Sequence, residues 1–139
     1  MKHKRGLPLV SQRKEISNAI VRNLGLLDSI ENGLICRICN TDAGVLAYHI
    51  IPQVTGYSAR FDPENVVWAC KKCNGREYFY RIRGRAHEIR KLHIQLFGAQ
   101  TVERLEKLSL RNTQYSTAQL KEMLTDIRMK VSKMGRSPA

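Results

Sequence analysis

Four cysteines, all that the chain contains, stand in two Cys-x-x-Cys pairs, Cys36/Cys39 and Cys70/Cys73. Each pair can present two thiolates from one tight turn, here called a knuckle, and two knuckles complete the tetrahedral shell of a Zn²⁺ ion. The alternative is two disulfides, but bridges this short constrain the unfolded chain little, and no signal peptide marks the protein for secretion. The spacing therefore predicts a structural zinc site formed by these four cysteines.

One histidine and two asparagines near the knuckles could carry chemistry. The imidazole of His49, with an ordinary pKa of about 6.5, can activate water at neutral pH. The amide oxygen of Asn74 is a suitable ligand for Mg²⁺, which takes water and phosphate oxygens as its other ligands. A base and a metal on opposite sides of a phosphate suit phosphodiester hydrolysis. The plainer alternatives are a hydrogen-bonded structural role for His49, a helix N-cap for Asn74 and a turn position for Asn65.

The segment between the knuckles has the composition of two strands joined by a loop. Residues 45–51 and 65–69 are rich in β-branched and aromatic side chains, and residues 53–63 contain the Gly and Pro of a loop. The order knuckle, strand, loop, strand, knuckle, helix predicts a β-hairpin and a helix pinned by zinc. In that arrangement His49 on the first strand faces Asn74 at the start of the helix.

Apolar residues at spacings of three and four predict helices on both sides of this segment. We expect them over residues 11–33 with Gly33 as C-cap, from Cys73 or Asn74 towards Leu96, around residues 102–108, and after a capping box of Ser116 and Gln119. The predicted fold class is α+β, in a single domain of residues 1–139. Its parts are an N-terminal helix at 11–33, a zinc-bound ββα core at 34–80 and C-terminal helices at 81–135.

The chain is strongly basic, with 24 Lys and Arg against 12 Asp and Glu, a net charge of +12 and a pI near 10.0. This excess predicts a polyanionic partner, and nucleic acid is favoured over a membrane surface because no strong basic amphipathic anchor is evident. No apolar run approaches the roughly 18 residues of a membrane span, so we expect an intracellular, cytoplasmic protein. The expected nucleic-acid-binding residues follow the second cysteine pair: Lys71, Lys72, Arg76, Arg81, Arg83 and Arg85.

The pattern C-x-x-C … H-I-I-P … N … C-x-x-C-N resembles the HNH, or ββα-metal, endonucleases that carry a four-cysteine zinc site. The run RFDPEN, the CN after the last cysteine pair, and the later YR and VERLE are similar to the NinG/Rap recombination endonucleases of lambdoid phages. The resemblance covers roughly residues 15–132 and is strongest over 36–81.

This resemblance implies a DNA endonuclease of a phage or its bacterial host, acting on branched or recombining DNA. It makes His49 the general base and Asn65 the residue that fixes the loop behind it. It makes Asn74 a ligand of a catalytic Mg²⁺ or Mn²⁺ ion, and Cys36, Cys39, Cys70 and Cys73 the structural zinc site. We expect DNA as the partner, and a homodimer is left open.

One position departs from the family pattern. Many HNH nucleases place Asp or His, a metal ligand, directly before the catalytic His, where this chain has Tyr48. A neutral phenol is a poor ligand, although NinG-type proteins also lack a carboxylate there. Asp42, Asp62 and Glu64 are the alternative ligands, and the sequence does not choose between them. The competing hypotheses are a non-catalytic zinc-stabilised DNA-binding module and an RNA-binding protein, because charge and knuckles do not distinguish the two polymers.

Overall fold

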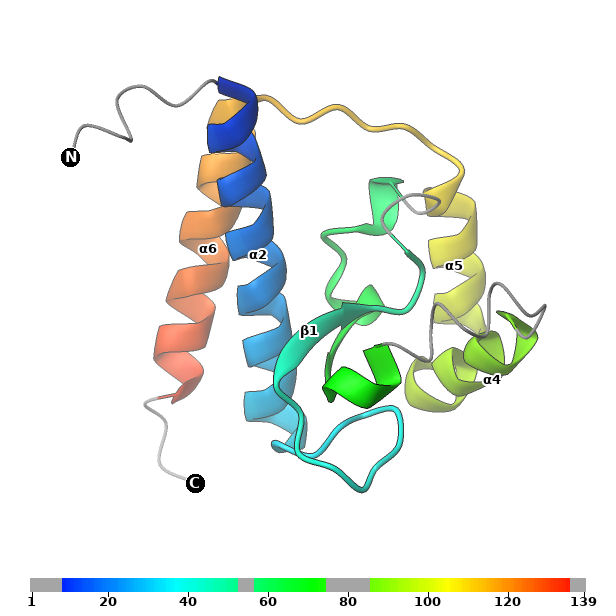
Figure 1. The fold of residues 1–139 in the computed structure, drawn as a ribbon. Helices are drawn as coiled ribbons and strands as arrows, with labels where there is room; N and C mark the ends of the chain where they lie inside the picture. Colours follow the sequence, from blue (N-terminus) through cyan, green and yellow to red (C-terminus); the bar gives the residue numbers. More distant parts are fainter. Residues whose placement is uncertain (1–8, 53–56, 75–85, 136–139) are drawn as a thin grey trace.

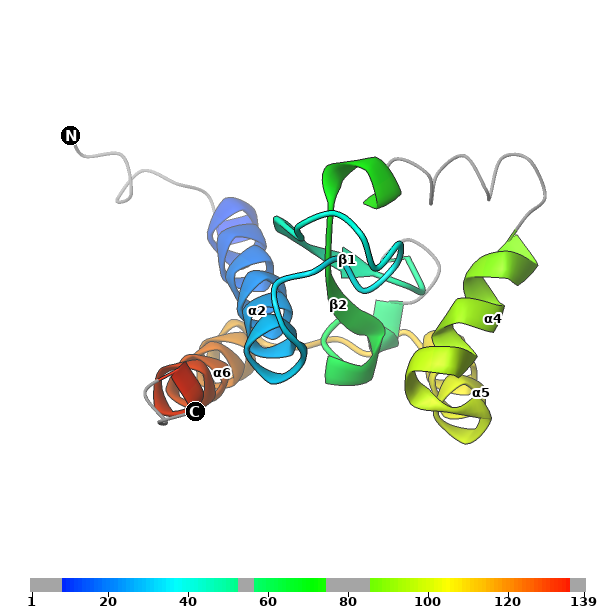
Figure 2. The same cartoon turned by 90° about the horizontal axis from the view of Figure 1, so that it is seen from below.

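The computed structural model of the chain describes residues 9–52, 57–74 and 86–135. At its centre lies an antiparallel two-stranded sheet of β1 (Leu46–His49) and β2 (Val66–Ala69). Figure 2 shows this hairpin between two pairs of helices, α2 and α6 on one side and α4 and α5 on the other. The described part is therefore a mixed structure of helices and sheet, in agreement with the predicted α+β class.

The register of the hairpin decides which side chains share a face. Tyr48 lies opposite Val67, and His49 lies opposite Val66. Because successive side chains of a strand point to opposite faces, Tyr48 and His49 belong to different faces of the sheet. Tyr48 and Val67 join the apolar cluster that contains the cysteines, whereas Val66 joins the cluster formed with α2 and α6.

Helix α2 (Leu9–Asn32) covers one face of the hairpin and lies beside α6 (Thr117–Gly135) (Figure 1). The core between them consists of small and aliphatic side chains from both helices and from β2: Ala19, Ile20, Leu24, Leu27, Val66, Leu120, Leu124 and Ile127. Gly25 allows the close approach of α2 to β1, since a Cβ at this position would lie 2.6 Å from the Cβ of Ala47.

The other face of the hairpin carries the cysteines and packs against α4 (Ala86–Phe97), which in turn lies beside α5 (Ala99–Ser109). Its core combines the cysteines with aliphatic and aromatic side chains: Cys36, Tyr48, Ile50, Val67, Ala69, Cys70, Cys73 and Ile89. Gly98, at φ 93°, separates α4 from α5, a backbone angle that favours glycine.

The loop between the strands contains two short 3₁₀ turns, η1 (Tyr57–Ala59) and η2 (Pro63–Asn65). The first lies within the predicted loop of residues 53–63, and the second includes Asn65, which the sequence predicted as the start of the second strand. Asp62 caps η2 by accepting a hydrogen bond from the backbone N–H of Glu64 at 3.0 Å. Pro63 then occupies the first position of the turn, where its missing N–H costs nothing. The turn thus has a local cause in the Asp-Pro-Glu-Asn sequence.

Most of the predicted helices agree with the structure. Gly33 ends α2 at φ 95°, and its N–H donates to the carbonyl of Ser29 at 2.8 Å. The capping box before α6 is confirmed, because Ser116 N–H donates to Gln119 Oε1 at 2.8 Å and Gln119 N–H donates to Ser116 Oγ at 3.1 Å. Residues 71–74 are helical and α4 ends at Phe97, but 75–85 lie outside the described residues. None of the helices in the described ranges has the length and apolarity to cross a membrane.

Candidate metal centre and active site

The four cysteine sulfurs converge on one point between the two knuckles. Their Sγ atoms all lie within 4.8 Å of one another, and Cys39 Sγ is 4.0 Å from Cys70 Sγ. Sulfurs at about 2.3 Å from a tetrahedral Zn²⁺ ion lie about 3.8 Å apart, so an ion such as zinc can be held here with a small contraction of the group. None of the four forms a disulfide, and Cys36, Cys70 and Cys73 are buried. The two pairs predicted from their spacing are therefore brought together as one candidate metal centre.

The backbone of each knuckle places its sulfurs by local hydrogen bonds. In the first knuckle, Asn40 N–H donates to the carbonyl of Cys36 at 2.9 Å, and Ile38 N–H donates to Cys36 Sγ at 3.4 Å. Asn40 adopts the left-handed conformation, at φ 58°, which asparagine tolerates better than most residues. In the second, Asn74 N–H donates to the carbonyl of Cys70 at 3.2 Å.

The thiols have unequal acidities in the absence of a metal. Hydrogen bonds from the Asp42 backbone and then from Thr41 lower the pKa of Cys39 to about 6. Burial, the largest cause, raises the pKa of Cys73. A coordinated Zn²⁺ ion deprotonates its thiol ligands outright and balances their charge. This group of four free cysteines, three of them buried, can hold a metal ion that compensates the negative charge of the thiolates.

Asp28 of α2 ties the first knuckle to the hairpin. One carboxylate oxygen accepts from Arg37 at 2.6 Å, and the other accepts from the backbone N–H of Trp68 at 2.9 Å. The backbone N–H of Arg37 in turn donates to the carbonyl of Trp68 at 2.9 Å. The Asp28 carboxylate is only 7% exposed, and both its oxygens have partners. The candidate metal centre is thereby held against the long N-terminal helix.

His49 stands at the end of β1 with its ring against the loop. Its Nε2 lies 2.8 Å from the carbonyl oxygen of Arg60. Because a carbonyl can only accept, Nε2 carries the proton, and Nδ1 of the neutral ring keeps a lone pair that can take another. Burial, the largest cause, and the charge of Arg60 lower the pKa of His49, against the opposing effect of the Arg60 carbonyl. The ring is therefore neutral at pH 7, the form that a general base requires.

Asn65 anchors the loop that supplies this carbonyl. Its fully buried side chain accepts from Ile51 N–H at 2.7 Å and donates to the carbonyls of Ile51 at 3.0 Å and Ala59 at 3.2 Å. Ile51 begins the loop and Ala59 directly precedes Arg60, so the amide fixes the loop relative to the end of β1. This geometry is consistent with the expected role of Asn65, which is to fix the loop behind a catalytic His49. That role in catalysis stays a prediction.

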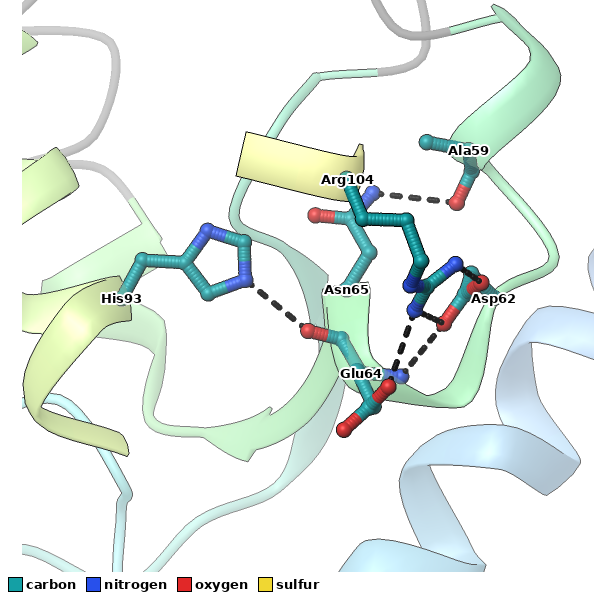
Figure 3. A network of polar contacts seen from close by, with 6 residues as sticks. All are labelled: Ala59, Asp62, Glu64, Asn65, His93 and Arg104. Atoms are coloured by element: carbon teal, nitrogen blue, oxygen red, sulfur yellow. Dashed lines mark hydrogen bonds and ion pairs between the residues drawn. The ribbon is translucent and has the colours of Figure 1, made fainter. Parts of the chain in front are cut away.

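Helices α4 and α5 hold the turn that carries Asn65 (Figure 3). Arg104 of α5 forms ion pairs with Asp62 at 3.0 Å and with Glu64 at 2.9 Å. His93 of α4 is 1% exposed, and its Nε2 lies 2.9 Å from the carbonyl of Glu64. Burial is the largest cause that lowers the pKa of His93. The sequence analysis did not single out His93 or Arg104, whose partners are far along the chain.

The described residues do not supply a second complete metal site. The four cysteines are the only group of three or more His, Cys, Asp or Glu side chains placed for a metal within the described ranges. Asp62 and Glu64 are engaged by Arg104, and Tyr48 is buried with the cysteines. Asn74 is exposed after the second knuckle, where it offers a single amide oxygen. The donor set expected for Mg²⁺ is thus incomplete in this part of the chain.

His49 and Asn74 come from opposite ends of the hairpin. His49 pairs with Val66, the first residue of β2, whereas Asn74 comes after Ala69, the last residue of β2. Within the described residues no hydrogen bond joins the two side chains, so their expected pairing across a metal stays a prediction.

Two of the six expected nucleic-acid-binding residues lie in the described part. Lys71 and Lys72 are exposed on the helical turn of the second knuckle. The other four, Arg76, Arg81, Arg83 and Arg85, lie outside the described residues. Arg60, which the sequence analysis did not single out, acts on His49 through its backbone carbonyl, a contribution that no side-chain pattern could reveal.

Comparison of the chain with protein-family models, with curated proteins and with solved structures gives no match.

Proposed function

We propose that this chain is a metal-dependent endonuclease that hydrolyses DNA phosphodiester bonds, with His49 as its general base. The observation that supports this most is the setting of the His49 ring. Its Nε2–H is bound to the Arg60 carbonyl at 2.8 Å, in a loop that the buried Asn65 anchors at both ends. A neutral imidazole held in one tautomer by a fixed carbonyl is preorganised to take a proton at its other nitrogen.

In the proposed reaction, Nδ1 of His49 takes a proton from the water whose oxygen forms the new bond to phosphorus. The bond from phosphorus to the leaving sugar oxygen breaks, and that oxygen is protonated by solvent. The Arg60 carbonyl then stabilises the imidazolium through the Nε2–H hydrogen bond. Lys71 and Lys72 reduce the charge of neighbouring phosphates. A bound Mg²⁺ or Mn²⁺ ion would supply further charge neutralisation at the phosphate. The family resemblance makes Asn74 a ligand of that ion, although Asn74 lies past the other end of the hairpin from His49.

The four-cysteine centre has a structural role in this proposal. A Zn²⁺ ion with four thiolate ligands has no open position for water or substrate, unlike catalytic zinc sites. Cys36 and Cys39 lie before β1, and Cys70 and Cys73 come directly after β2. Zinc would thus close the base of the hairpin that carries His49 at its other end.

A second candidate function is a zinc-stabilised DNA- or RNA-binding module without hydrolytic activity. The observation that favours it is the incomplete donor set for a catalytic ion. Tyr48 is buried at the usual ligand position, and the nearby carboxylates of Asp62 and Glu64 are bound to Arg104. Under this alternative the His49 ring serves only to hold the loop through the Arg60 carbonyl.

A nuclease assay on a panel of nucleic acids separates the two candidates. The zinc-loaded protein is incubated with linear, nicked, single-stranded and four-way-junction DNA and with RNA, each with and without added Mg²⁺ or Mn²⁺. The first proposal predicts cleavage of at least one DNA form that depends on the added ion, and the family resemblance favours the four-way junction. Binding without cleavage of any form, under every metal condition, would support the second candidate.

A further inference from the structure

A basic pocket opens beside the loop that supports His49, on the side of α2 and α6. It has a volume of about 290 Å³ and is lined by Arg13, Lys14 and Ser17 of α2, by Arg60 and Phe61 of the loop, and by Tyr115 and Leu120. Three of its lining residues are cations and none is acidic. The pocket is formed by three segments that are far apart in the sequence. The basic cluster after the second knuckle, which the sequence analysis identified, is a different group of residues and does not indicate it.

The charge of Arg13 is fixed in position without being neutralised. Its guanidinium donates to Thr117 Oγ1 at 3.0 Å and to the carbonyl of Tyr115 at 2.5 Å, both uncharged acceptors. Lys14 is exposed next to it. Within the described ranges neither Arg13 nor Lys14 forms an ion pair with a carboxylate. A preorganised guanidinium with spare donors, beside an exposed ammonium group, is a suitable arrangement for binding a phosphate.

Arg60 connects this pocket to the candidate base. Its guanidinium lies over the ring of Phe61, 4.7 Å from the centroid, and Phe61 packs edge-on against Tyr115 at 5.6 Å. A cation–π contact orients the guanidinium. The backbone carbonyl of the same residue accepts the hydrogen bond from His49. The Arg60 charge also lowers the pKa of His49, as expected for a cation close to the imidazole.

We infer that this pocket binds one backbone phosphate of the nucleic acid, next to the phosphate that His49 addresses, through Arg13, Lys14 and Arg60. The inference rests on the proposed function for the identity of the polymer. Arg60 of the pocket belongs to the loop that positions His49, so a phosphate bound in the pocket would set the register of the strand relative to the base. The aromatic rings of Phe61 and Tyr115 offer apolar contact to the adjoining sugar.

The test is the salt dependence of binding to duplex DNA, measured by fluorescence anisotropy without added Mg²⁺ or Mn²⁺ so that no strand is cut. The triple variant Arg13→Gln/Lys14→Gln/Arg60→Gln should lower the slope of log K against log salt by about 0.9, the loss of one phosphate contact. The double variant Arg128→Gln/Lys130→Gln removes exposed cations of α6 outside the pocket. It should keep the wild-type slope.

Arg13 also joins α2 to the segment before α6, so thermal unfolding is recorded for every variant. Lys14→Gln removes an exposed cation without a hydrogen bond in the described structure, and it should weaken DNA binding several-fold at low salt while keeping the wild-type unfolding temperature. An unchanged affinity in folded Lys14→Gln, an unchanged slope in the folded triple variant, an equal loss in the α6 control, or no binding of DNA by the wild type would each overturn the inference.

Binding and cleavage are scored separately, so the two proposals can fail separately. A wild type that binds DNA with the pocket-dependent slope but never cuts would remove the nuclease proposal and leave the phosphate pocket. A wild type that cuts while the triple variant keeps the wild-type slope would remove only the pocket.

Discussion

At the scale of single residues, the candidate active site depends on one buried amide. Asn65 satisfies the backbone N–H of Ile51 and the carbonyls of Ile51 and Ala59, and its side chain is fully buried. Asn65→Ala would leave the N–H and the carbonyl of Ile51 without these partners, at a cost of about 1–3 kcal/mol for each group that water cannot reach. The Ala59 carbonyl keeps the hydrogen bond from Asp62 N–H. We expect the free energy of unfolding, measured in urea, to fall by several kcal/mol.

A matched control for this prediction is Asn18→Ala, which removes an exposed asparagine of α2. Its effect should stay within about 0.5 kcal/mol. If Asn65→Ala were as stable as Asn18→Ala, the loop behind His49 would not depend on the amide, and the proposed positioning of the Arg60 carbonyl would lose its basis.

Two imidazoles, the half-buried His49 and the buried His93, give stability a dependence on pH. Burial lowers the pKa of both His49 and His93 in the folded chain. As pH falls below the unfolded value of about 6.5, the unfolded chain therefore binds protons that the folded chain does not, and folding becomes less stable. Above that pH both imidazoles are neutral in the folded and the unfolded chain, so this loss of stability is absent. Urea unfolding at pH 7.5, 6.5 and 6.0, with zinc content checked at each pH, should show this loss.

His93→Gln tests how much the His93 ring contributes to this pH dependence. Glutamine can still donate to the Glu64 carbonyl, which His93 Nε2 contacts at 2.9 Å, but it does not titrate. The variant should therefore lose less stability between pH 7.5 and 6.0 than the wild type. An identical pH dependence in the two proteins would show that His93 does not bind fewer protons when folded.

At the scale of the elements, the close contact of α2 with the hairpin depends on Gly25. A Cβ added there would lie 2.6 Å from Ala47 Cβ and 2.9 Å from Ala47 Cα, so the helix must move off β1. Gly25→Ala should lower stability by about 1–3 kcal/mol despite the better helix propensity of alanine, because overcrowding outweighs it. The measurement is again the free energy of unfolding in urea.

Gly135→Ala at the end of α6 is the matched substitution. An added Cβ there would meet only Ile30 Cδ1 at 3.9 Å, an ordinary van der Waals contact. It should change stability by less than about 1 kcal/mol, and in the stabilising direction. Equal effects of the two substitutions would contradict the tight packing of α2 on β1.

The elements with local signals could be predicted from the sequence. Gly33 ends α2 because its φ of 95° suits glycine, and Ser116 with Gln119 starts α6 by a reciprocal pair of side-chain bonds. The two cysteine pairs likewise carry their geometry in their spacing. Each of these signals lies within a few residues, so no tertiary structure is needed to interpret it.

The rest of the site depends on contacts that no local pattern contains. Arg60 contributes a backbone carbonyl to His49, and every residue type has that group. His93 lies on the apolar stripe of α4 and reaches the carbonyl of Glu64, 29 positions earlier. Arg13 meets Thr117 across 104 positions only because α2 and α6 lie side by side. The basic pocket is therefore a property of the assembled fold.

At the scale of the whole molecule, the metal centre joins the segments before and after the hairpin. Zinc binding to such sites is worth about 10–16 kcal/mol in small peptides, as much as or more than the roughly 5–15 kcal/mol that stabilises a typical domain. We therefore expect about one Zn²⁺ per chain by elemental analysis, unfolding when a chelator removes the metal, and refolding when zinc is returned.

Cys70→Ser tests the same zinc centre by removing one of its ligands. Cys70 is 5% exposed and 4.0 Å from Cys39 through their sulfurs, so serine would leave the ion with three thiolates. The variant should lose zinc and the cooperative thermal transition of the wild type. Two disulfides and no metal in protein purified from a reducing cytoplasm would contradict the zinc centre.

The central claim is that His49 takes a proton during DNA cleavage, and the rate of a single turnover tests it most directly. Wild type and His49→Ala are compared on the DNA form that the wild type cuts best, after both are shown to contain zinc, to be folded and to bind that DNA equally. We predict a cleavage rate about 10²–10⁴-fold lower for His49→Ala, the usual contribution of a general base. A folded, zinc-loaded His49→Ala that cleaves as fast as the wild type would contradict the claim.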